Sequence, residues 1–368
     1  MTVWLYASKI RFYQGCEKEY HIISYQGDIN MNRLLHLSRR TMLRAGVLAA
    51  LAVAMPLAAQ AKKLELRYGH MNSTNSVAGQ QAQMFADLVE KYTNGEVTIR
   101  VYPSSQLGKM QEMAEATSTG AIAISHNTAG GTGSLYEPFG ALDTPYLYRD
   151  VDHLMKVTEI DSPVMKSLNE GLIENAGVRV LYAYCFGTRH LTANKAVYKP
   201  ADLSGEKIRA LPFPVYMTAV EALGAVPVPV DWSEVPTALA TGQVSGQENP
   251  VDVVVSSKLY EAQSHLMLTG HIMNPEVIVM NNRVWKKLTD EQRAAFEKAA
   301  LEVREKATRM VVEQEASQLD ELKKLGMTVI GPEDGLDLDA FKKNAADLVA
   351  QRFAAKYGDL YKQIAAIK

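Results

Sequence analysis

Two arginines of this chain stand where a carboxylate could be held. Arg209 lies in the predicted strand EKIRALP (206–212), and if Ile208 faces the core, alternation turns Arg209 toward a cleft or solvent. Arg189 comes just after a second predicted strand, 178–186. A guanidinium presents a rigid fork of donors that fits a carboxylate in bidentate fashion. From these residues alone, a solvated surface arginine is the simpler interpretation of each.

The polar segment TGQVSGQENPVD, residues 241–252, follows a predicted apolar helix and raises a similar question. It is either an ordinary polar turn or a loop that holds a ligand. Its asparagine, Asn249, carries an amide that can donate a hydrogen bond to a carboxylate without adding charge. Pro250 prevents simple continuation of regular structure. The segment by itself leaves both interpretations open.

The standard signatures of catalysis are missing from the sequence. It contains no G-x-S-x-G, H-E-x-x-H, G-x-x-x-x-G-K-[ST] or C-x-x-C motif. The histidines after residue 62 share no metal-ligand spacing on one helix. A hydrolase or lyase acting on a sugar acid would need a nucleophile or an acid–base pair, and only the isolated Glu248 and Asp252 are available. We expect no catalytic residue, metal or cofactor.

The composition sets limits on the class of protein. The chain has 368 residues, 47% of them apolar and 22% charged, with a formal net charge of −2. This predicts a globular protein with enough length for more than one core. The near-neutral charge argues against a nucleic-acid partner, which normally requires a basic surface. The two cysteines, Cys16 and Cys185, cannot form a disulfide framework, and Cys185 is expected to be buried as a small apolar residue.

Residues 31–61 have the organisation of an export signal peptide. A basic start is followed by an apolar run from 45 to 59 and by an A-x-A cleavage site that ends at Ala61. The pair Arg39–Arg40 matches a twin-arginine signal, and a general secretory signal with adjacent arginines is the alternative. We therefore expect export to the periplasm and cleavage after Ala61. Residues 1–30 are interpreted as a misassigned start upstream of the signal.

The rest of the chain predicts alternating strands and helices. Strands are expected near 64–71, 96–103 and 121–125, and the helix before the third should begin near Ser104–Ser105. The same alternation recurs between 178 and 282. It indicates α/β units built on a largely parallel sheet. Because no Gly/Ser-rich linker separates the two units, we expect two lobes joined by strands that cross more than once.

The segment 288–326 predicts an unusually long helix. Thr289, with Gln292 three residues later, forms a capping box, and nothing breaks the helix before Gly326. About 36 residues at 1.5 Å each give roughly 54 Å, which is longer than a small domain is wide. A single helix of that length would have to lie across both lobes. The alternative is two helices with a bend near residues 315–317.

Several motifs occur in order along the chain after the signal. They are LRYGH (66–70), VYPSSQLG (101–108), GTRHLT (187–192), DLSGEKIR (202–209), TALATGQVSGQENP (237–250) and LTGH (268–271), followed by the long helix. With them the chain resembles the substrate-binding subunits of tripartite ATP-independent periplasmic (TRAP) transporters, the DctP-type family. The resemblance implies two α/β lobes that close over an organic acid, with the long helix spanning both.

The resemblance also implies a set of ligand-binding residues: Arg209, Asn249, Arg189, Trp232, Asn72 (or Met71 in the alternative register), Thr128 and Asn127. Arg209 matches the arginine that grips the ligand carboxylate, Asn249 binds the same region, and Arg189 matches a second arginine contact. Trp232 matches an aromatic residue over the ligand. Thr128 stands nearest the position where sialic-acid binders carry a glutamate, which argues against sialic acid.

On this resemblance, the segment GQENP becomes a loop that aims Asn249 into the cleft. Pro250 would fix the turn, and Gly246 would allow close approach of the backbone.

The function that the resemblance implies is capture of a small organic anion, without catalysis, and delivery to the small and large membrane subunits of a TRAP transporter. The anion would be a C4-dicarboxylate, a sugar acid or another hydroxy or keto acid, and the protein a monomer or a homodimer. A receptor of the same fold for a signalling system is the alternative. A broken helix in 289–325 would instead favour the binding protein of an ATP-driven importer.

The resemblance implies the following domain boundaries. Residues 1–61 form the upstream extension and signal, 62–186 form lobe I (completed by about 276–310), and 187–275 form lobe II (completed by about 311–368).

Overall fold

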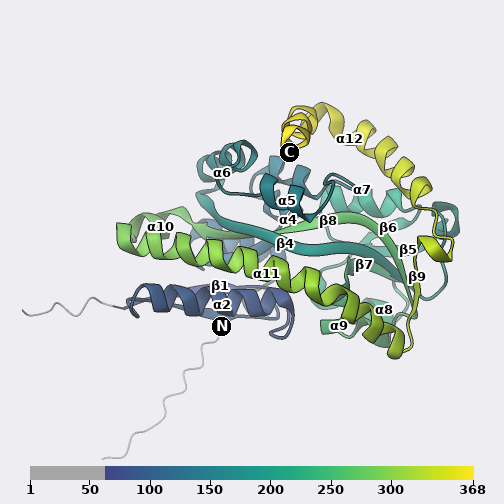
Figure 1. The fold of residues 1–368 in the computed structure, drawn as a ribbon, viewed down its shortest axis with the longest axis horizontal. Coiled ribbons are helices and arrows are strands. Elements are labelled where there is room, and N and C mark those ends of the chain that lie inside the picture. Colours follow the sequence, from purple (N-terminus) through teal and green to yellow (C-terminus); the bar gives the residue numbers. More distant parts are fainter. Residues whose placement is uncertain (1–62) are drawn as a thin grey trace, which may run out of the picture. The chain divides into compact units, whose positions relative to one another are not determined.

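The computed structural model describes residues 63–368, so the predicted export signal at 31–61, its cleavage site and residues 1–30 lie outside the described residues. The described chain is built on one mixed sheet with helices on both faces (Figure 1). Its strands follow the order β2-β1-β3-β8-β4-β7-β5-β6, with β9 paired to β8. They are β1 (Leu64–Gly69), β2 (Val97–Tyr102), β3 (Ile124–Thr128), β4 (Val178–Ala193), β5 (Lys207–Ala210), β6 (Val226–Pro229), β7 (Gly246–Pro250), β8 (His265–Asn281) and β9 (Thr328–Ile330).

The helices come between and after these strands. The α-helices are α2 (Val77–Tyr92), α3 (Met110–Thr119), α4 (Ala129–Thr132), α5 (Val151–Val157), α6 (Pro163–Ala176), α7 (Pro214–Ala222), α8 (Val235–Ala240), α9 (Val251–Ser256), α10 (Asn282–Lys287), α11 (Asp290–Lys324) and α12 (Leu338–Ala366). Short 3₁₀ helices are η1 (Glu137–Asp143), η2 (Pro200–Leu203), η3 (Trp232–Glu234), η4 (Leu259–Glu261) and η5 (Pro332–Asp334). Within residues 63–368, no helix combines the length and the apolar character that crossing a membrane requires.

The two ends of the sheet are parallel and its centre is antiparallel. β1 runs parallel to β2 and β3 at one end, and β5 runs parallel to β6 and β7 at the other. The long strands β4 and β8 pair antiparallel with each other and pass from one end to the other. The prediction of two lobes joined by crossing strands is therefore confirmed, whereas a largely parallel sheet describes only the two ends. The domain boundaries given above stay a prediction.

The pairing of β4 with β8 is irregular near its middle. The register shifts between Cys185 and Gly187 and again between Arg189 and Leu191. Gly187 has a φ of 122°, which side chains rarely tolerate, and a Cβ there would stand 2.9 Å from the Cβ of Pro250. Cys185 is buried beside this bulge, as expected, and its backbone N–H donates to the Thr308 hydroxyl on α11 at 3.1 Å.

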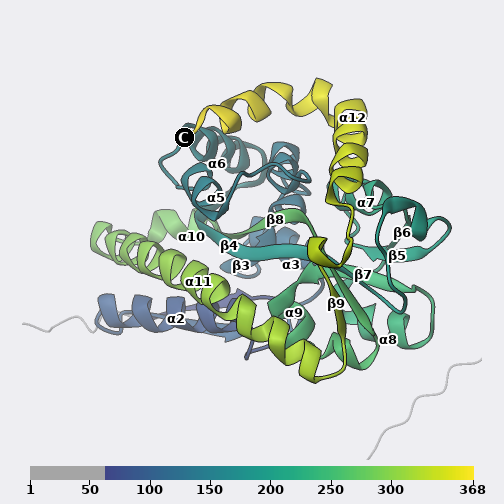
Figure 2. The same cartoon turned by 45° about the vertical axis from the view of Figure 1, so that its right-hand side comes forward.

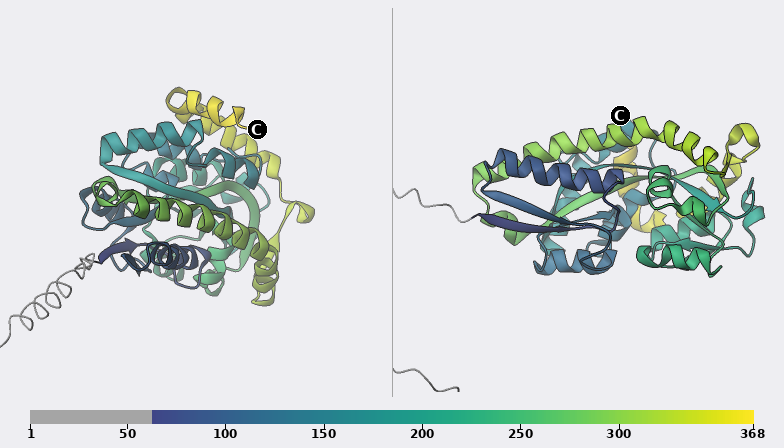
Figure 3. Two further views of the ribbon diagram at one scale, coloured as in Figure 1. Left: turned by 60° about the vertical axis from the view of Figure 1, so that its left-hand side comes forward. Right: turned by 90° about the horizontal axis from the view of Figure 1, so that it is seen from below.

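The long helix predicted for 288–326 is a single helix, α11, of 35 residues. Its capping box forms as predicted, with the Gln292 N–H donating to the Thr289 hydroxyl at 3.2 Å and the Thr289 N–H donating to the Gln292 side chain at 3.1 Å. Phe296 packs in the core of α2 and β2, and Leu322 packs in the core of α8 and α9. The helix therefore connects the cores of both lobes, as Figure 3 shows from below.

A second long helix, α12, also connects separate cores. Phe341 near its start packs with the residues of β5 and α7, and Ile364 near its end packs with those of α5 and α6. Phe353 and Tyr357 in between stack with ring centroids 5.6 Å apart. Figure 2 shows the helix arching over the same side of the sheet as α5, α6 and α7.

One predicted helix starts later than its sequence indicated. Instead of beginning near Ser104–Ser105, α3 begins at Met110, after Lys109. Ser104 and Ser105 both adopt left-handed conformations, with φ values of 53° and 59°, so they form a turn. The N-terminus of α3 is capped by Glu112, whose carboxylate accepts a hydrogen bond from the Lys109 N–H at 2.8 Å.

Candidate binding site

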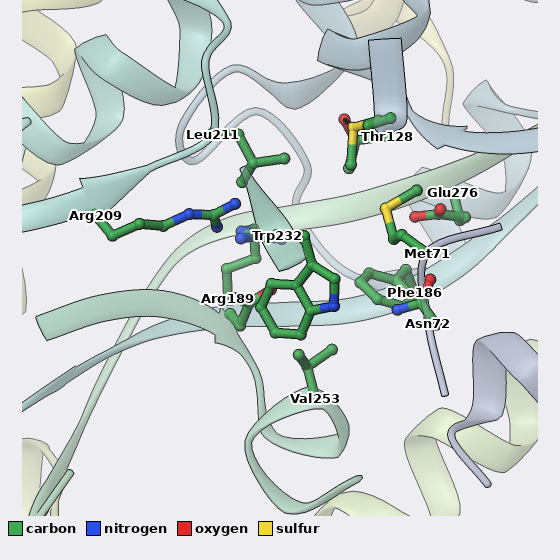
Figure 4. Close-up of a pocket in the computed structure, with 12 residues that line it drawn as sticks. Met71, Asn72, Thr128, Phe186, Arg189, Arg209, Leu211, Trp232, Val253 and Glu276 are labelled. Atoms are coloured by element: carbon green, nitrogen blue, oxygen red, sulfur yellow. Dashed lines mark hydrogen bonds between the residues drawn. The ribbon is translucent and has the colours of Figure 1, made fainter. Parts of the chain in front are cut away.

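A narrow cavity lies beside the bulge of β4, between the two ends of the sheet (Figure 4). Its lining includes most of the residues singled out in the sequence: Arg209, Asn249, Arg189, Trp232, Asn72, Thr128 and the alternative Met71. It also includes residues that sequence reasoning did not identify: Met110, Phe186, Leu211, Val253 and Glu276. Asn127 is fully buried but is not part of the lining, and its amide donates to the Met110 carbonyl at 3.3 Å.

Arg209 reaches the cavity from β5. Ile208 faces the core, so alternation turns Arg209 toward the cleft, where only 1% of it is exposed. Its Nε donates to the Val230 carbonyl at 2.9 Å, while Nη1 is buried without a partner among residues 63–368. Burial lowers the pKa of Arg209 to about 10, so the guanidinium stays charged at neutral pH. The interpretation of this residue as a solvated surface arginine is therefore wrong.

Trp232 forms one wall of the cavity next to this guanidinium. It belongs to η3, which directly precedes α8, and its ring centroid lies 5.8 Å from the guanidinium carbon of Arg209. A cation over an indole face is attracted by the ring quadrupole. Trp232 therefore both encloses the cavity and orients Arg209.

Arg189, on β4, is equally buried but its charge is neutralised by the protein. Its Nε donates to Glu248 Oε2 at 2.5 Å and its Nη2 donates to Oε1 at 2.8 Å, which makes a bidentate pair. Nη1 donates to the Asn274 side chain at 3.1 Å, and the guanidinium lies 5.0 Å from the Tyr216 ring centroid. The interpretation of Arg189 as a solvated surface arginine is therefore wrong as well.

Glu248 is the centre of this paired group. Burial by itself disfavours its charge, but Arg189 and a hydrogen bond with His271 lower the pKa of Glu248 to about 2. His271 Nε2 lies 3.1 Å from Glu248 Oε2. Arg189 and Glu248 are thus a charged pair with no net charge, and Arg189 is the member that lines the cavity.

The segment GQENP is a strand, β7, and the prediction of a loop is wrong. It pairs antiparallel with β4 and parallel with β5, so its backbone is held on both sides. Gly246 does allow a close approach, since a Cβ there would stand 2.2 Å from the Thr192 carbonyl oxygen. Asn249 lines the cavity, and its amide donates to the Gln247 side chain at 2.5 Å.

The other end of the cavity carries polar groups without positive charge. Glu276 on β8 lies opposite Thr128 on β3, and its Oε2 is buried without a partner among the described residues. Burial, helped by the charge of Asp143, raises the pKa of Glu276 to about 8. The Asn72 side-chain oxygen lies 3.0 Å from His126 Nε2. At neutral pH this end of the cavity therefore presents a protonated carboxyl, a hydroxyl and an amide.

Glu276 could have been noticed in the sequence. It is the single charged residue in the apolar run 275–280, PEVIVM. A charged side chain in a strand that is buried on both faces is rarely accommodated unless it has a partner or a function. Phe186, Leu211 and Val253 carry no such signal, because apolar side chains that line a cavity have the same pattern as those of a core.

The comparisons with known proteins agree with this architecture. Residues 68–356 match the family model of the bacterial extracellular solute-binding proteins, family 7 (DctP). The chain is 31% identical to the sialic acid-binding periplasmic protein SiaP of Vibrio cholerae, over 76% of this chain and 85% of that protein. It is 32% identical to the C4-dicarboxylate-binding periplasmic protein DctP of Rhodobacter capsulatus, over 79% of this chain and 87% of that protein.

A solved structure extends the similarity to three dimensions. The TRAP periplasmic solute-binding protein of Polaromonas sp. JS666, bound to D-erythronate, has a TM-score of 0.76 and 33% identity, covering 83% of this chain and 98% of that one. Two of these proteins are named for their ligands and the third was solved with a ligand bound; the three ligands differ, but all are organic acids.

Proposed function

The chain belongs to the bacterial extracellular solute-binding proteins of family 7, and we propose that it captures a small organic acid by its carboxylate and delivers it to the membrane subunits of a TRAP transporter. We further propose that it acts in the periplasm, without catalysis or cofactor. The names of its relatives support both proposals, since all three are periplasmic binding proteins and each is associated with an organic acid.

The buried, unpartnered Nη1 of Arg209 is the observation that carries this proposal. An uncompensated charge away from water destabilises a protein by several kcal/mol, whereas a hydrogen-bonded counter-ion offsets that cost. The charge of Glu248 favours the charged form of Arg209, but the Glu248 carboxylate oxygens are hydrogen-bonded to Arg189 and His271 rather than to Arg209. A ligand carboxylate in the cavity would complete the group, with the Asn249 amide as a second donor.

The cavity lies where closure of the two lobes would enclose a ligand. Arg209 and Asn249 come from β5 and β7 at one end of the sheet, while Thr128 and Asn72 come from the end that holds β3 and β1. A ligand that contacts both sets would hold the lobes together. We propose hinge closure about β4 and β8, which connect the lobes.

The test is a thermal-shift and calorimetric screen of organic acids against ligand-free protein. A ligand that binds only the folded state raises the melting temperature by mass action. At least one acid should raise it for the wild type and for Arg309→Met, which removes an exposed arginine of α11, but not for Arg209→Met. Wild-type affinity in Arg209→Met, or no shift with any carboxylate, would contradict the proposal.

A further inference from the structure

The charges around the cavity match a ligand with one carboxylate. Two arginines line it, and the charge of Arg189 is cancelled by its bidentate pairing with Glu248. Of the described residues that line the cavity, none is a lysine, so Arg209 is left as the unmatched cation. One ligand carboxylate would balance Arg209. A second carboxylate would find no positive charge at the opposite end.

Glu276 occupies that opposite end. In Figure 4 its carboxyl and the Arg209 guanidinium enter the cavity from opposite sides. Its Oε2 is buried without a partner among residues 63–368, and Thr128 lies directly across from it in the sheet. A buried oxygen without a hydrogen bond is costly, and a ligand group that can pair with it would remove that cost.

No cation from the surrounding elements compensates Glu276. His126, on β3, approaches Oε1 to 3.7 Å, but burial and the nearby His70 lower the pKa of His126, so it stays neutral. Tyr184 faces it from β4, and the more distant charges of Asp143 and Arg189 act in opposite directions on it. Burial therefore dominates, and the carboxyl is neutral at pH 7.

We propose, building on the organic-acid function above, that Glu276 determines the class of ligand by hydrogen-bonding a hydroxyl at the end of the molecule remote from the Arg209-bound carboxylate. A hydroxyl can both donate and accept, so it pairs with either protonation state of Glu276. A carboxylate only accepts, and beside an ionised Glu276 it would place two like charges in a dry site. Above the pKa of Glu276, where its carboxyl is ionised, the cavity thus selects hydroxylated monocarboxylates over C4-dicarboxylates. Below that pKa the protonated carboxyl can donate to a second carboxylate, so the selection weakens.

Two acids of four carbons, D-erythronate and succinate, test this selection by calorimetry at pH 6 and pH 8.5. Wild-type protein should bind erythronate at least about tenfold more tightly than succinate at pH 8.5, and succinate should weaken further as the pH rises while erythronate changes little. Glu276→Gln keeps the shape but cannot ionise. It should reduce the preference at pH 8.5 by about tenfold, mainly through tighter binding of succinate.

A matched control is Glu170→Gln, which replaces an exposed carboxylate on α6 and should leave both affinities unchanged. Equal or tighter binding of succinate by the wild type at pH 8.5 would overturn the proposal, as would a preference at that pH that Glu276→Gln does not alter. The wild-type pH series tests it even if the variant folds poorly. If one of these two results is found while binding still depends on Arg209, the proposed role of Glu276 is wrong but the organic-acid function stands. If neither acid nor any other carboxylate binds, both fail.

Discussion

Arg189 and Arg209 are equally buried, but only Arg189 has a hydrogen-bonded counter-ion. Arg189 has a bidentate partner in Glu248 and a further acceptor in Asn274. Arg209 has one hydrogen bond, from Nε to the Val230 carbonyl, and an unpartnered Nη1. The first arginine therefore stabilises the folded chain, and the second is positioned for an external anion.

We expect opposite effects on stability when each arginine becomes methionine. Arg189→Met leaves Glu248 as an unpaired buried charge and should lower the free energy of unfolding by about 3–5 kcal/mol. Arg209→Met removes an uncompensated charge and should leave that free energy unchanged or higher. Urea denaturation of the ligand-free variants measures both. A larger loss for Arg209→Met than for Arg189→Met would contradict this interpretation.

Glu276 should make stability depend on pH in a defined direction. Its pKa is 4.5 in the reference state and about 8 in the fold, so between these values the unfolded chain has released the proton that the folded chain retains. Stability therefore falls as the pH rises from about 4.5 to 8, by on the order of 4 kcal/mol. The difference in unfolding free energy between wild type and Glu276→Gln, measured at pH 5 and pH 8.5, isolates this effect. Identical pH profiles of the two proteins would exclude it.

For individual residues, the sequence predicted the hydrogen-bond donors of the cavity better than the acceptors that pair with them. Arg209, Asn249 and Arg189 came from recognisable motifs, and all three line one cavity. The pairing of Arg189 with Glu248 could not be predicted, because it depends on strands 59 residues apart in the chain being brought into register. The role of those residues in ligand binding stays a proposal.

The bulge in β4 is the element that places Arg189 and Phe186 at the cavity. Gly187 lies between them at a φ of 122°, in close contact with Pro250 of β7. A side chain at this position would strain the backbone and separate the two strands. The bulge is therefore held by a residue without a Cβ.

Gly187→Ala should lower the free energy of unfolding by about 2–3 kcal/mol and weaken ligand binding. The control is Gly242→Ala, which also has a positive φ of 72° but no neighbour within 4 Å of the added Cβ. It should cost only about 1 kcal/mol and leave binding intact. Chemical denaturation and calorimetry of both variants check this, and equal losses would show that contact with Pro250 is unimportant.

The long helix α11, which has strong local signals, was predicted correctly, whereas the strand β7, which has none, was not. α11 has a capping box and no internal glycine or proline, so its continuity follows from the local sequence. The segment GQENP is polar and contains a glycine and a proline, which is typical of loops, yet it forms β7 because β4 and β5 flank it. Tertiary pairing overrode local propensity there.

At the scale of the whole molecule, α11 and α12 each connect cores that the crossing strands also connect. The two halves of the sheet are therefore joined by both strands and helices. A break in α11 between its two buried regions should loosen the lobes without removing any residue that lines the cavity.

Ala316→Pro provides that break, because Ala316 is exposed and lies between the buried Val311 and Leu322. An internal proline should lower the free energy of unfolding by about 3 kcal/mol and weaken ligand binding. Asp290→Pro is the control, since proline is tolerated at the first position of a helix. Unchanged binding and stability in Ala316→Pro would show that continuity of α11 is dispensable.

The unsatisfied guanidinium of Arg209 has a consequence for the fidelity of transport. Closure without cargo would leave Nη1 dry and unpartnered, which would disfavour the vacant closed form relative to an open one. A transporter that recognises the closed shape would then discriminate against empty carriers. Arg209 would thus reduce binding of the empty protein to the membrane subunits, so that fewer encounters with the transporter occur without a ligand to carry.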